Sequence, residues 1–406
     1  MTAAGGLGGD WSVAPVRDPG GFRDLAAEWD ALADRCASAT PFQRSGWLCA
    51  WWDHYGDGAS LHVVTVRRDG RLVAGAALMT RRLAGVRVLG PVGGGLSDIT
   101  EFLVDETVRD EAVRHLARSV LAEPGWQVVE LPEVRADGVA AAVAAHWRGA
   151  VSVASSVCLE VPFGSVEALL AGTEGRSRKR LRTRIRKVRA TGVEYLPAGP
   201  GAAVGTSTGV ATLLDLHALQ WEGRGGNPEH RTPRFAAMLT GALDVLVPAG
   251  VAHLDLYRVD GVDVAAMLLL VGPRAVYAYL LGVSPALRDG GDGAALTLSR
   301  SLDVVEHRER VALDMLRGAE SYKRRWQSVE IPQRRVLLSR RRSPGAASYV
   351  ATVRVRAALR DRVRDRAPEL HARLGATVRA LRADGAGSAA RTLLTRRPPG
   401  SGSSTT

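Results

Sequence analysis

The fold is decided by residues 275–294, which read AVYAYLLGVSPALRDGGDGA. Apolar and aromatic residues from Ala275 to Val283 predict a strand, and Pro285 ends it. A glycine-rich turn follows, and three leucines within residues 296–302 then indicate a helix. The order of strand, glycine turn and helix is typical of an α/β fold.

Two hairpins in the chain resemble each other closely. The first runs through Leu61–Val66 and Leu72–Met79, and the second lies 191 positions later, through Leu254–Tyr257 and Val264–Val271. Each turns at an Asp-Gly pair, which favours a two-residue hairpin loop. Six positions are identical between them: His62 and His253, Arg67 and Arg258, Asp69 and Asp260, Gly70 and Gly261, Val73 and Val264, and Ala74 and Ala265. The sequence predicts that one fold has been duplicated, although a generic strand-turn-strand pattern explains part of the match.

The same kind of pattern extends over most of the chain. Helices are predicted at Gly21–Arg35, Trp47–Tyr55 and Arg109–Leu121, and a further strand at Gln127–Leu131. We therefore expect an α/β fold with a mixed sheet, in which two related domains precede a helical extension. The expected divisions are an N-terminal domain at 10–150, a C-terminal domain at 151–340, a basic helical extension at 341–395 and a disordered tail at 396–406.

Length and composition agree with this organisation. With 406 residues and 46% hydrophobic content, the chain is long enough for two compact domains and an appendage. The most apolar runs, such as Val264–Val271, are far too short to cross a bilayer, so we expect a cytoplasmic, soluble protein. Cys36, Cys49 and Cys158 form no close pair, which argues against a disulfide framework and a thiolate metal site. No metal is expected.

The chain carries a formal charge of +12, which favours anionic partners. Nucleic acid, membrane phospholipid and a phosphorylated small molecule all fit, and charge alone does not choose among them. Arginine supplies 51 of the 54 basic residues, a bias that a GC-rich genome produces without functional selection. Part of the basic character is therefore expected to carry no functional information.

The glycine turn at residues 288–294 has the geometry of an anion site. The start of a helix exposes unpaired N–H groups, and glycines let a phosphate approach them closely. The pattern Arg288-x-x-Gly291-x-Gly293-Ala294, placed after a strand, resembles the acetyl-CoA signature of the GNAT acyltransferase family. An ordinary glycine-rich loop between a strand and a helix is the alternative.

This resemblance implies tandem GNAT-like domains, with the donor bound in the second one. It implies that the backbone of Leu281, Gly282 and Val283 pairs with the pantetheine arm of acetyl-CoA or another acyl-CoA. The residues implied to hold the pyrophosphate are Arg288, Gly290, Gly291, Gly293 and Ala294. Asp289 and Asp292 place carboxylates near these phosphates, which leaves the identity of the donor open.

A second cluster lies at Val311–Trp326, where a short strand runs into RGAESYKRRW. Its most specific part is Gly318-x-Glu320-x-Tyr322-Lys323. Taken with other segments, it resembles the CelD-like or FemAB-like acetyltransferase family over roughly residues 10–335. Those segments are Pro41-Phe42-Gln43, the Trp47–Trp52 aromatics, Ser97-Asp98 and the His217–Trp221 helix.

Acyl transfer to an amine needs a base, a polarised carbonyl and an acid for the departing thiolate. Glu320 is the first candidate for the base and His217 the second, and by the resemblance Tyr322 is the acid. The expected acceptor contacts are Lys323 for a carboxylate or phosphate, Trp221 and Trp326 as walls, and Asp98. The alternatives are structural: an ion pair between Glu320 and Lys323, a core position for Tyr322, a packing role for His217 and a turn role for Asp98.

Between the two predicted domains, residues 176–189 form a helix with nine basic residues in fourteen. Leu181, Ile185 and Val188 form a narrow apolar stripe, so the helix is expected to dock on one side only. A phosphate-rich acceptor, an RNA donor and arginine bias compete as explanations. Fem-type relatives use aminoacyl-tRNA, but they usually insert a long coiled coil, and no sustained heptad run is present.

The C-terminal extension predicts a second basic element. Amphipathic helices are expected within Tyr349–Arg382, broken near Pro368. They either dock on a membrane surface or pack as a lid on the second domain.

These observations lead to one main hypothesis and two alternatives. The main hypothesis is a bacterial N-acyltransferase that transfers an acyl group from acyl-CoA to an amine or amino sugar in envelope or exopolysaccharide metabolism. Its second half would be active, and its first half would be a degenerate copy that shapes the acceptor cleft. The alternatives are a tRNA-dependent Fem-type aminoacyltransferase and a non-catalytic binding protein of polysaccharide assembly. The expected location is the cytoplasm, with a peripheral contact at the inner face of the membrane left open.

Overall fold

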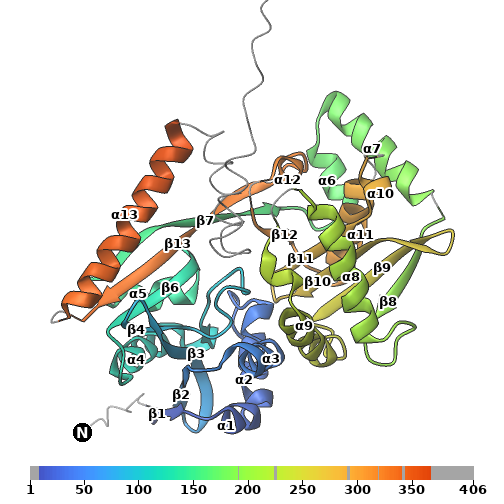
Figure 1. Cartoon of the computed structure of the whole chain (residues 1–406). Helices are drawn as coiled ribbons and strands as arrows, with labels where there is room; N and C mark the ends of the chain where they lie inside the picture. Colours follow the sequence, from blue (N-terminus) through green and yellow to red (C-terminus); the bar gives the residue numbers. More distant parts are fainter. Residues whose placement is uncertain are drawn as a thin grey trace, which may run out of the picture.

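The computed structural model describes residues 9–366, apart from 191, 224–225, 290–292, 319 and 341–342. The side chains of 288, 289, 321, 360, 361 and 363–366 also lie outside the description. Within the described residues, the strands form one large mixed sheet that runs through both halves of the chain (Figure 1).

The main strands and helices follow a similar order in the two halves, although α6 and α7 occur only in the second. The first half contains β1 (Trp11–Val16), α1 (Pro19–Asp24), α2 (Ala26–Asp34), η1 (Pro41–Gln43), α3 (Ser45–Tyr55), β2 (Ser60–Arg68), β3 (Arg71–Leu83), β4 (Val86–Pro91), β5 (Leu103–Val104), η2 (Glu106–Val108), α4 (Arg109–Ala122), β6 (Val128–Arg135), α5 (Val139–Ala145) and β7 (Val151–Val161). The second half contains α6 (Val166–Gly172), α7 (Gly175–Arg189), β8 (Glu194–Ala198), α8 (Thr206–Trp221), η3 (Pro228–Arg231), α9 (Pro233–Leu246), β9 (Ala252–Val259), β10 (Val262–Val271), β11 (Ala275–Val283), α10 (Pro285–Asp289), α11 (Gly293–His307), β12 (Ala312–Arg317), α12 (Ser321–Arg324) and β13 (Val329–Ser339), and α13 (Pro344–Arg366) follows it.

The order of strands in the sheet reveals an internal symmetry. Its path is β1-β2-β3-β4-β6-β13-β7-β12-β11-β10-β9-β8, with β5 paired to β3. From either end inward, five strands follow one another in chain order, β1 to β6 on one side and β8 to β12 on the other. Parallel pairs occur at corresponding places, β4 with β6 and β11 with β12. This order confirms the expected α/β fold with two related units.

The two hairpins also share their irregularities. Asp69 and Gly70 have φ values of 51° and 78°, and Asp260 and Gly261 have 49° and 79°. Positive φ at both central residues is the geometry of a type I′ turn. A register shift skips Val73 in the first hairpin and the corresponding Val264 in the second. Shared bulges at the same offset are more than a generic hairpin would produce.

The two halves exchange their last strands. β7 pairs antiparallel with β12 of the second half, and β13 pairs antiparallel with β6 of the first half. β7 and β13 also pair with each other along most of their length through the centre of the sheet. The halves are therefore joined by two crossing strands instead of a flexible linker. The division expected between residues 150 and 151 falls at the start of β7 and stays a prediction.

Strands in the second half are covered on both faces. Along β10, Ala266, Leu268 and Leu270 belong to the same buried cluster as Leu213 of α8. The intervening residues Met267, Leu269 and Val271 belong to a second cluster with Leu296 of α11. Successive residues of a strand point to opposite faces, so α8 covers one face and α11 the other.

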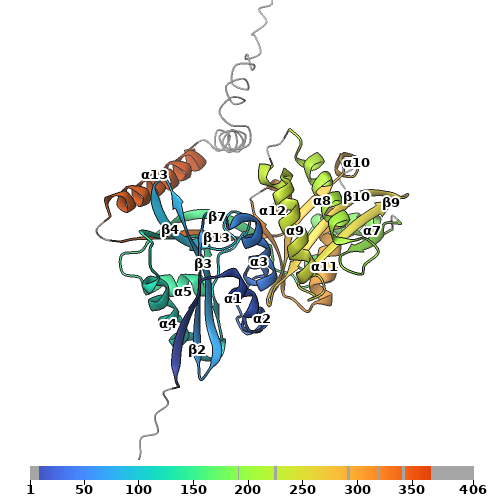
Figure 2. The ribbon, with the colours of Figure 1, turned by 60° about the horizontal axis from the view of Figure 1, so that its bottom comes forward.

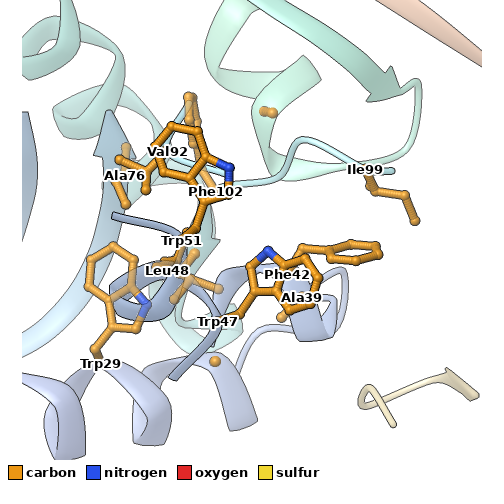
Figure 3. Close-up of a cluster of buried hydrophobic side chains, with 14 of the residues drawn as sticks. Trp29, Ala39, Phe42, Trp47, Leu48, Trp51, Ala76, Val92, Ile99 and Phe102 are labelled. Carbon is orange, nitrogen blue, oxygen red and sulfur yellow. The ribbon is translucent and has the colours of Figure 1, made fainter. Parts of the chain in front are cut away.

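The N-terminal aromatic residues form a buried cluster, shown in Figure 3. Trp29, Phe42, Trp47 and Trp51 are at most 1% exposed. The Phe42 and Trp47 rings stand edge to face with centroids 5.3 Å apart, and Tyr279 of β11 completes the group at 5.1 Å from Trp47. Phe42 and Trp47 therefore pack against the second half through Tyr279, whereas Trp29 packs on Phe22 within the first half.

Two expectations about helices need correction. The single helix predicted for Gly21–Arg35 is divided at Leu25, and its first part starts earlier, at Pro19, where the Asp18 side chain caps it. Asp18 and Pro19 together are a strong start signal for a helix.

The C-terminal helix α13 packs on the first half, and not on the second domain as a lid. Ala346 and Val350 of α13 form a small buried cluster with Val86 and Val88 of β4 and Leu337 of β13. Figure 2 shows α13 beside the strands of the first half. Residues from 367 onward, including Pro368 and the expected tail, lie outside the described part. Among the described residues, no helix is long and apolar enough to cross a membrane.

Candidate functional site

A cleft of about 1160 Å³ lies between the two halves. The first half lines it with the loop at 94–100 and with residues at the ends of β3, β4 and β6. The second half lines it with α8, β11, α11, β12 and α12. A molecule in this cleft would contact both copies of the duplicated fold.

The strands β11 and β12 separate as they approach the cleft. They pair in parallel only at Ala275 with Ala312, Val276 with Leu313 and Tyr277 with Asp314. Residues 278–283 of β11 therefore have no neighbouring strand on that side among the described residues. On the other edge, the N–H of Ser284 donates to the Val264 carbonyl at 2.9 Å. In an antiparallel pair, the backbone groups of successive residues point alternately toward the partner strand and away from it. Because those of Ser284 point toward β10, those of Leu281 and Val283 point toward the gap.

Gly282 is required by close packing. A Cβ atom there would lie 2.6 Å from the backbone N of His217 and 2.8 Å from the carbonyl O of Leu213. Helix α8 crosses β11 too closely for any side chain. At Gly293, which begins α11, a Cβ atom would lie 3.0 Å from Cγ1 of Val283. Both glycines thus have a packing reason in addition to the donor contact that the sequence predicted.

His217 reaches the gap from α8. Its Nδ1 donates to the Leu281 carbonyl at 2.7 Å, because a carbonyl only accepts. Nε2 is then the accepting nitrogen and takes a hydrogen bond from Nδ1 of His230 at 3.2 Å. Burial lowers the pKa of His217, and burial together with His217 and Arg317 lowers the pKa of His230 to about 3. Both rings are neutral near pH 7, and both nitrogens of His217 are engaged.

Arg317 joins the two halves in the middle of the cleft. Its guanidinium forms an ion pair with Asp98 and lies 3.6 Å from Glu133, both in the first half. Burial opposes the charge of Arg317, but the two carboxylates outweigh it and leave the pKa raised. Ser156 donates to Glu133 at 2.5 Å, and Gln333 donates to the Asp98 carbonyl at 2.9 Å. Asp98 is therefore part of a polar network that ties the halves together.

Lys323 is buried in the wall of the second half. Its Nζ donates to the carbonyls of Met315 and Arg317 at 2.8 and 3.0 Å. Nζ also lies 3.0 Å from Oε2 of Glu320, although this contact lacks the alignment of a hydrogen bond. The ion pair considered as the structural alternative is thus present, and both side chains line the cleft.

Glu320 and Tyr322 flank that lysine. The Glu320 carboxylate covers Gly318, where a Cβ atom would lie 2.4 Å from Oε1. Gly318 has a φ of 115°, which favours glycine, so the turn has both steric and conformational reasons for it. Burial, with Glu320 nearby, raises the pKa of Tyr322, and its hydroxyl stays protonated. Trp326 is 5% exposed and closes the cleft behind these groups.

The remaining predicted site residues differ in whether they line the cleft and in whether the structure describes them. Trp221, Leu281 and Ala294 line the cleft, whereas Gly282, Val283 and Gly293 are buried and do not line it. Gly290 and Gly291 lie outside the described residues, as does the side chain of Arg288. The binding of a pyrophosphate by these three residues stays a prediction.

Several cleft residues were not found from the sequence. His230 partners His217, Tyr279 donates to the Leu96 carbonyl at 3.1 Å, and Arg317 pairs across the halves. Glu133 was missed as well. Glu133 and Leu316 both have positive φ, 54° and 56°, at matching bends of β6 and β12, and this correspondence is visible only in the folded chain.

Metal ligation has no support in the described part of the chain. Among those residues, no group of three or more His, Cys, Asp or Glu side chains is arranged to hold a metal ion.

Fold and site together define the class of the protein, a tandem α/β protein with two related halves and an opened strand pair in the second half. Residues 175–324, in the second half, match the family model of the acetyltransferase (GNAT) domain.

Among solved structures, FemX supports the fold, and L-PGS is a weaker likeness. FemX superposes with a TM-score of 0.59 at 13% identity, over 77% of this chain and 95% of that chain. The L-PGS from Bacillus licheniformis gives a TM-score of 0.49 at 12% identity, over 81% and 96%. No curated protein matches this chain in sequence. At these identities the likeness to FemX describes the fold alone.

Proposed function

We propose that the protein is an N-acyltransferase that moves an acyl group from acyl-CoA to an amine bound between its two halves. The observation that carries this proposal is the gap between β11 and β12, toward which the backbone groups of Leu281 and Val283 turn. Leu281 lines the cleft, and its carbonyl already accepts from His217, so its N–H is the group that a donor would meet first. The amide-containing arm of a thioester donor can add to such an edge as an extra strand. The match of residues 175–324 to the acetyltransferase (GNAT) domain supports this placement.

The phosphates of the donor would lie at the start of α11. Gly293 is the first residue of this helix, and Ala294 and Thr297 face the cleft. A helix start offers free N–H groups and a positive dipole end, which favour a pyrophosphate. Acetyl-CoA is the simplest donor of this kind, and other acyl chains fit the same contacts.

The chemistry requires one bond to form and one to break. The neutral amine attacks the thioester carbonyl carbon, an amide bond forms, and the carbon–sulfur bond breaks. In our proposal Glu320 takes the proton of the amine, and Tyr322 gives a proton to the departing thiolate. His217 remains the second candidate for the base, but it would first have to release His230.

The acceptor would occupy the part of the cleft that belongs to the first half. Trp221 and Trp326 would form its walls, and Asp98 would contact it beside Arg317. Arg81 also lines this region and has no ion-pair partner among the described residues, so it suits an anionic group on the acceptor. We propose an amine or amino sugar of envelope or exopolysaccharide metabolism, following the family resemblance of the sequence.

Calorimetry of the full chain with acetyl-CoA tests the donor site. The Ala294→Glu variant places a carboxylate in the first turn of α11, where the fold tolerates an acid but a phosphate is repelled. We expect it to weaken binding at least tenfold, whereas the neutral Ala294→Gln variant retains most of it. If the wild-type chain binds no acyl-CoA, the proposal is wrong. Tight, salt-sensitive binding of charged tRNA would then favour the Fem-type alternative.

Release of the CoA thiol in the presence of a panel of amines and amino sugars tests the chemistry. The Tyr322→Phe and Glu320→Gln variants should each lower kcat by a factor on the order of 10²–10⁴ and leave acetyl-CoA affinity unchanged. Full activity in Tyr322→Phe would remove the proposed acid. A chain that binds acyl-CoA or acceptor without any transfer would favour the non-catalytic alternative.

A further inference from the structure

The positive charge of the chain is concentrated in two segments. The fifteen residues of α7 carry a formal charge of +9, and residues 341–406 carry +10. The remainder of the chain is therefore net negative, at −7. A genomic preference for arginine over lysine explains which basic residue is used, but it does not explain this clustering.

Helix α7 presents its charge to solvent. Ile185 and Val188 are 4% and 3% exposed and pack into the core of the second half. Six basic side chains of the helix are exposed and have no ion-pair partner among the described residues: Arg176, Lys179, Arg180, Arg182, Arg184 and Arg186. Like charges placed side by side on a helix repel each other. An anionic surface that faces them offsets this repulsion.

Helix α13 presents a different surface. Ala346, Val350 and Ala357 are buried, whereas Val355 and Leu359, one turn apart on the outside, are 58% and 52% exposed. Arg354, Arg356 and Arg362 are exposed around them. Apolar side chains framed by arginines suit the boundary between lipid headgroups and acyl chains.

Phosphates of a bilayer and phosphates of RNA would both suit α7. The two helices together favour the bilayer. Neither helix exposes an aromatic side chain on which bases could stack, because α7 has none and Tyr349 of α13 points inward to Glu130 at 2.6 Å. The exposed pair Val355 and Leu359 has no counterpart to contact on a nucleic-acid backbone.

We propose that α7 and α13 dock the protein on an anionic phospholipid bilayer, with α7 contributing charge and α13 contributing charge and two apolar anchors. Helix α7 packs on the second half and α13 on the first, and both lie in the upper part of Figure 1, away from α1 and α2. Docking would hold the cleft between them near the membrane surface. This inference concerns surfaces outside the cleft and does not depend on acyl transfer.

Sedimentation with lipid vesicles tests the proposal on the full chain. At 0.1 M salt, vesicles of phosphatidylcholine with about one third phosphatidylglycerol should bind the protein, and phosphatidylcholine alone should not. Replacing Arg180, Arg182, Arg184 and Arg186 with glutamine should weaken binding on the order of 100-fold. The matched control replaces four exposed arginines on α1, on α4 and after α5, away from α7 and α13, and changes net charge equally: R23Q, R114Q, R118Q and R148Q. We expect it to bind within about threefold of wild type.

The apolar anchors have their own variant. V355S/L359S should weaken vesicle binding about tenfold at both low and high salt, because burial of apolar area is not screened. Circular dichroism confirms that each variant is folded. Absence of binding to anionic vesicles, or an equal loss in the matched control, would overturn the proposal. Binding to tRNA with no binding to these vesicles would overturn it in favour of a nucleic-acid surface.

Discussion

Replacing Gly282 with alanine tests how closely α8 crosses β11. The new methyl group would lie 2.6 Å from the backbone N of His217 and 2.8 Å from the carbonyl O of Leu213, whereas ordinary contacts begin at 3.4 Å. Both neighbours are backbone atoms, so no side-chain rotation relieves the overlap. Helix α8 would have to retreat by roughly 0.6–0.8 Å, and the hydrogen bond from His217 to Leu281 beside it would lengthen.

The expected cost follows from this overlap. Forcing a methyl group into a packed core costs about 1–3 kcal/mol. A change of that size lowers the melting temperature by about 2–4 °C per kcal/mol in a protein of a few hundred residues. We expect Gly282→Ala to melt about 2–12 °C below wild type in a thermal scan without any ligand.

A second glycine provides the control. A Cβ atom added at Gly192 would meet no other atom within 4 Å, and this residue has no left-handed φ, so Gly192→Ala should leave the melting temperature nearly unchanged. If Gly282→Ala melted within 1 °C of wild type, the packing argument would fail. The glycine would then have to be explained by donor binding alone.

Two further predictions concern buried charges. Glu101 accepts from the N–H groups of Phe102 and Ala140 at 2.8 and 2.6 Å, yet burial raises its pKa to about 7. The folded state holds this proton more tightly than the unfolded state, so the free energy of unfolding should fall by roughly 3 kcal/mol between pH 4.5 and 8. Urea unfolding at pH 5 and 8 should show that Glu101→Gln removes this part of the pH dependence, and an unchanged slope would contradict it. Asp314 is 0% exposed and pairs with Arg135 across the halves, so Asp314→Ala should destabilise the protein by about 3–5 kcal/mol, and unaltered urea unfolding would refute this.

The duplicated α/β fold could be predicted because its signals are local. The Asp-Gly turns at 69–70 and 260–261, and the strand, turn and helix at 275–294, each depend on neighbours in sequence. The exchange of β7 and β13 could not be predicted. Both strands pair with partners far away in the chain, and their own sequences do not record which partner that is. The sequence does not show that α13 packs on the first half, because its partners there are also far away in the chain.

The candidate site could be predicted only in part. The structure brings Glu320, Tyr322 and Lys323 to one cleft with His217 and Asp98, and the roles assigned to them stay predictions. These side chains were found because a compact motif and a family resemblance mark them.

Arg317 and His230 could not be found in that way. The role of Arg317 in the site depends on its ion pairs with Asp98 and Glu133 of the other half. The role of His230 depends on its hydrogen bond to α8. Both kinds of contact form only when the chain folds, so the sequence does not show them.

The crossing of β7 and β13 has a consequence for synthesis on the ribosome. β6 ends at Arg135, but the strand that pairs beside it, β13, begins only at Val329. At about 5–20 residues per second, roughly 10–40 s pass before that neighbour is made. During this interval the emerging first half has an uncovered strand edge, and β7 waits for β12. The second half can be completed once β12 is made, and the first half only after β13 follows.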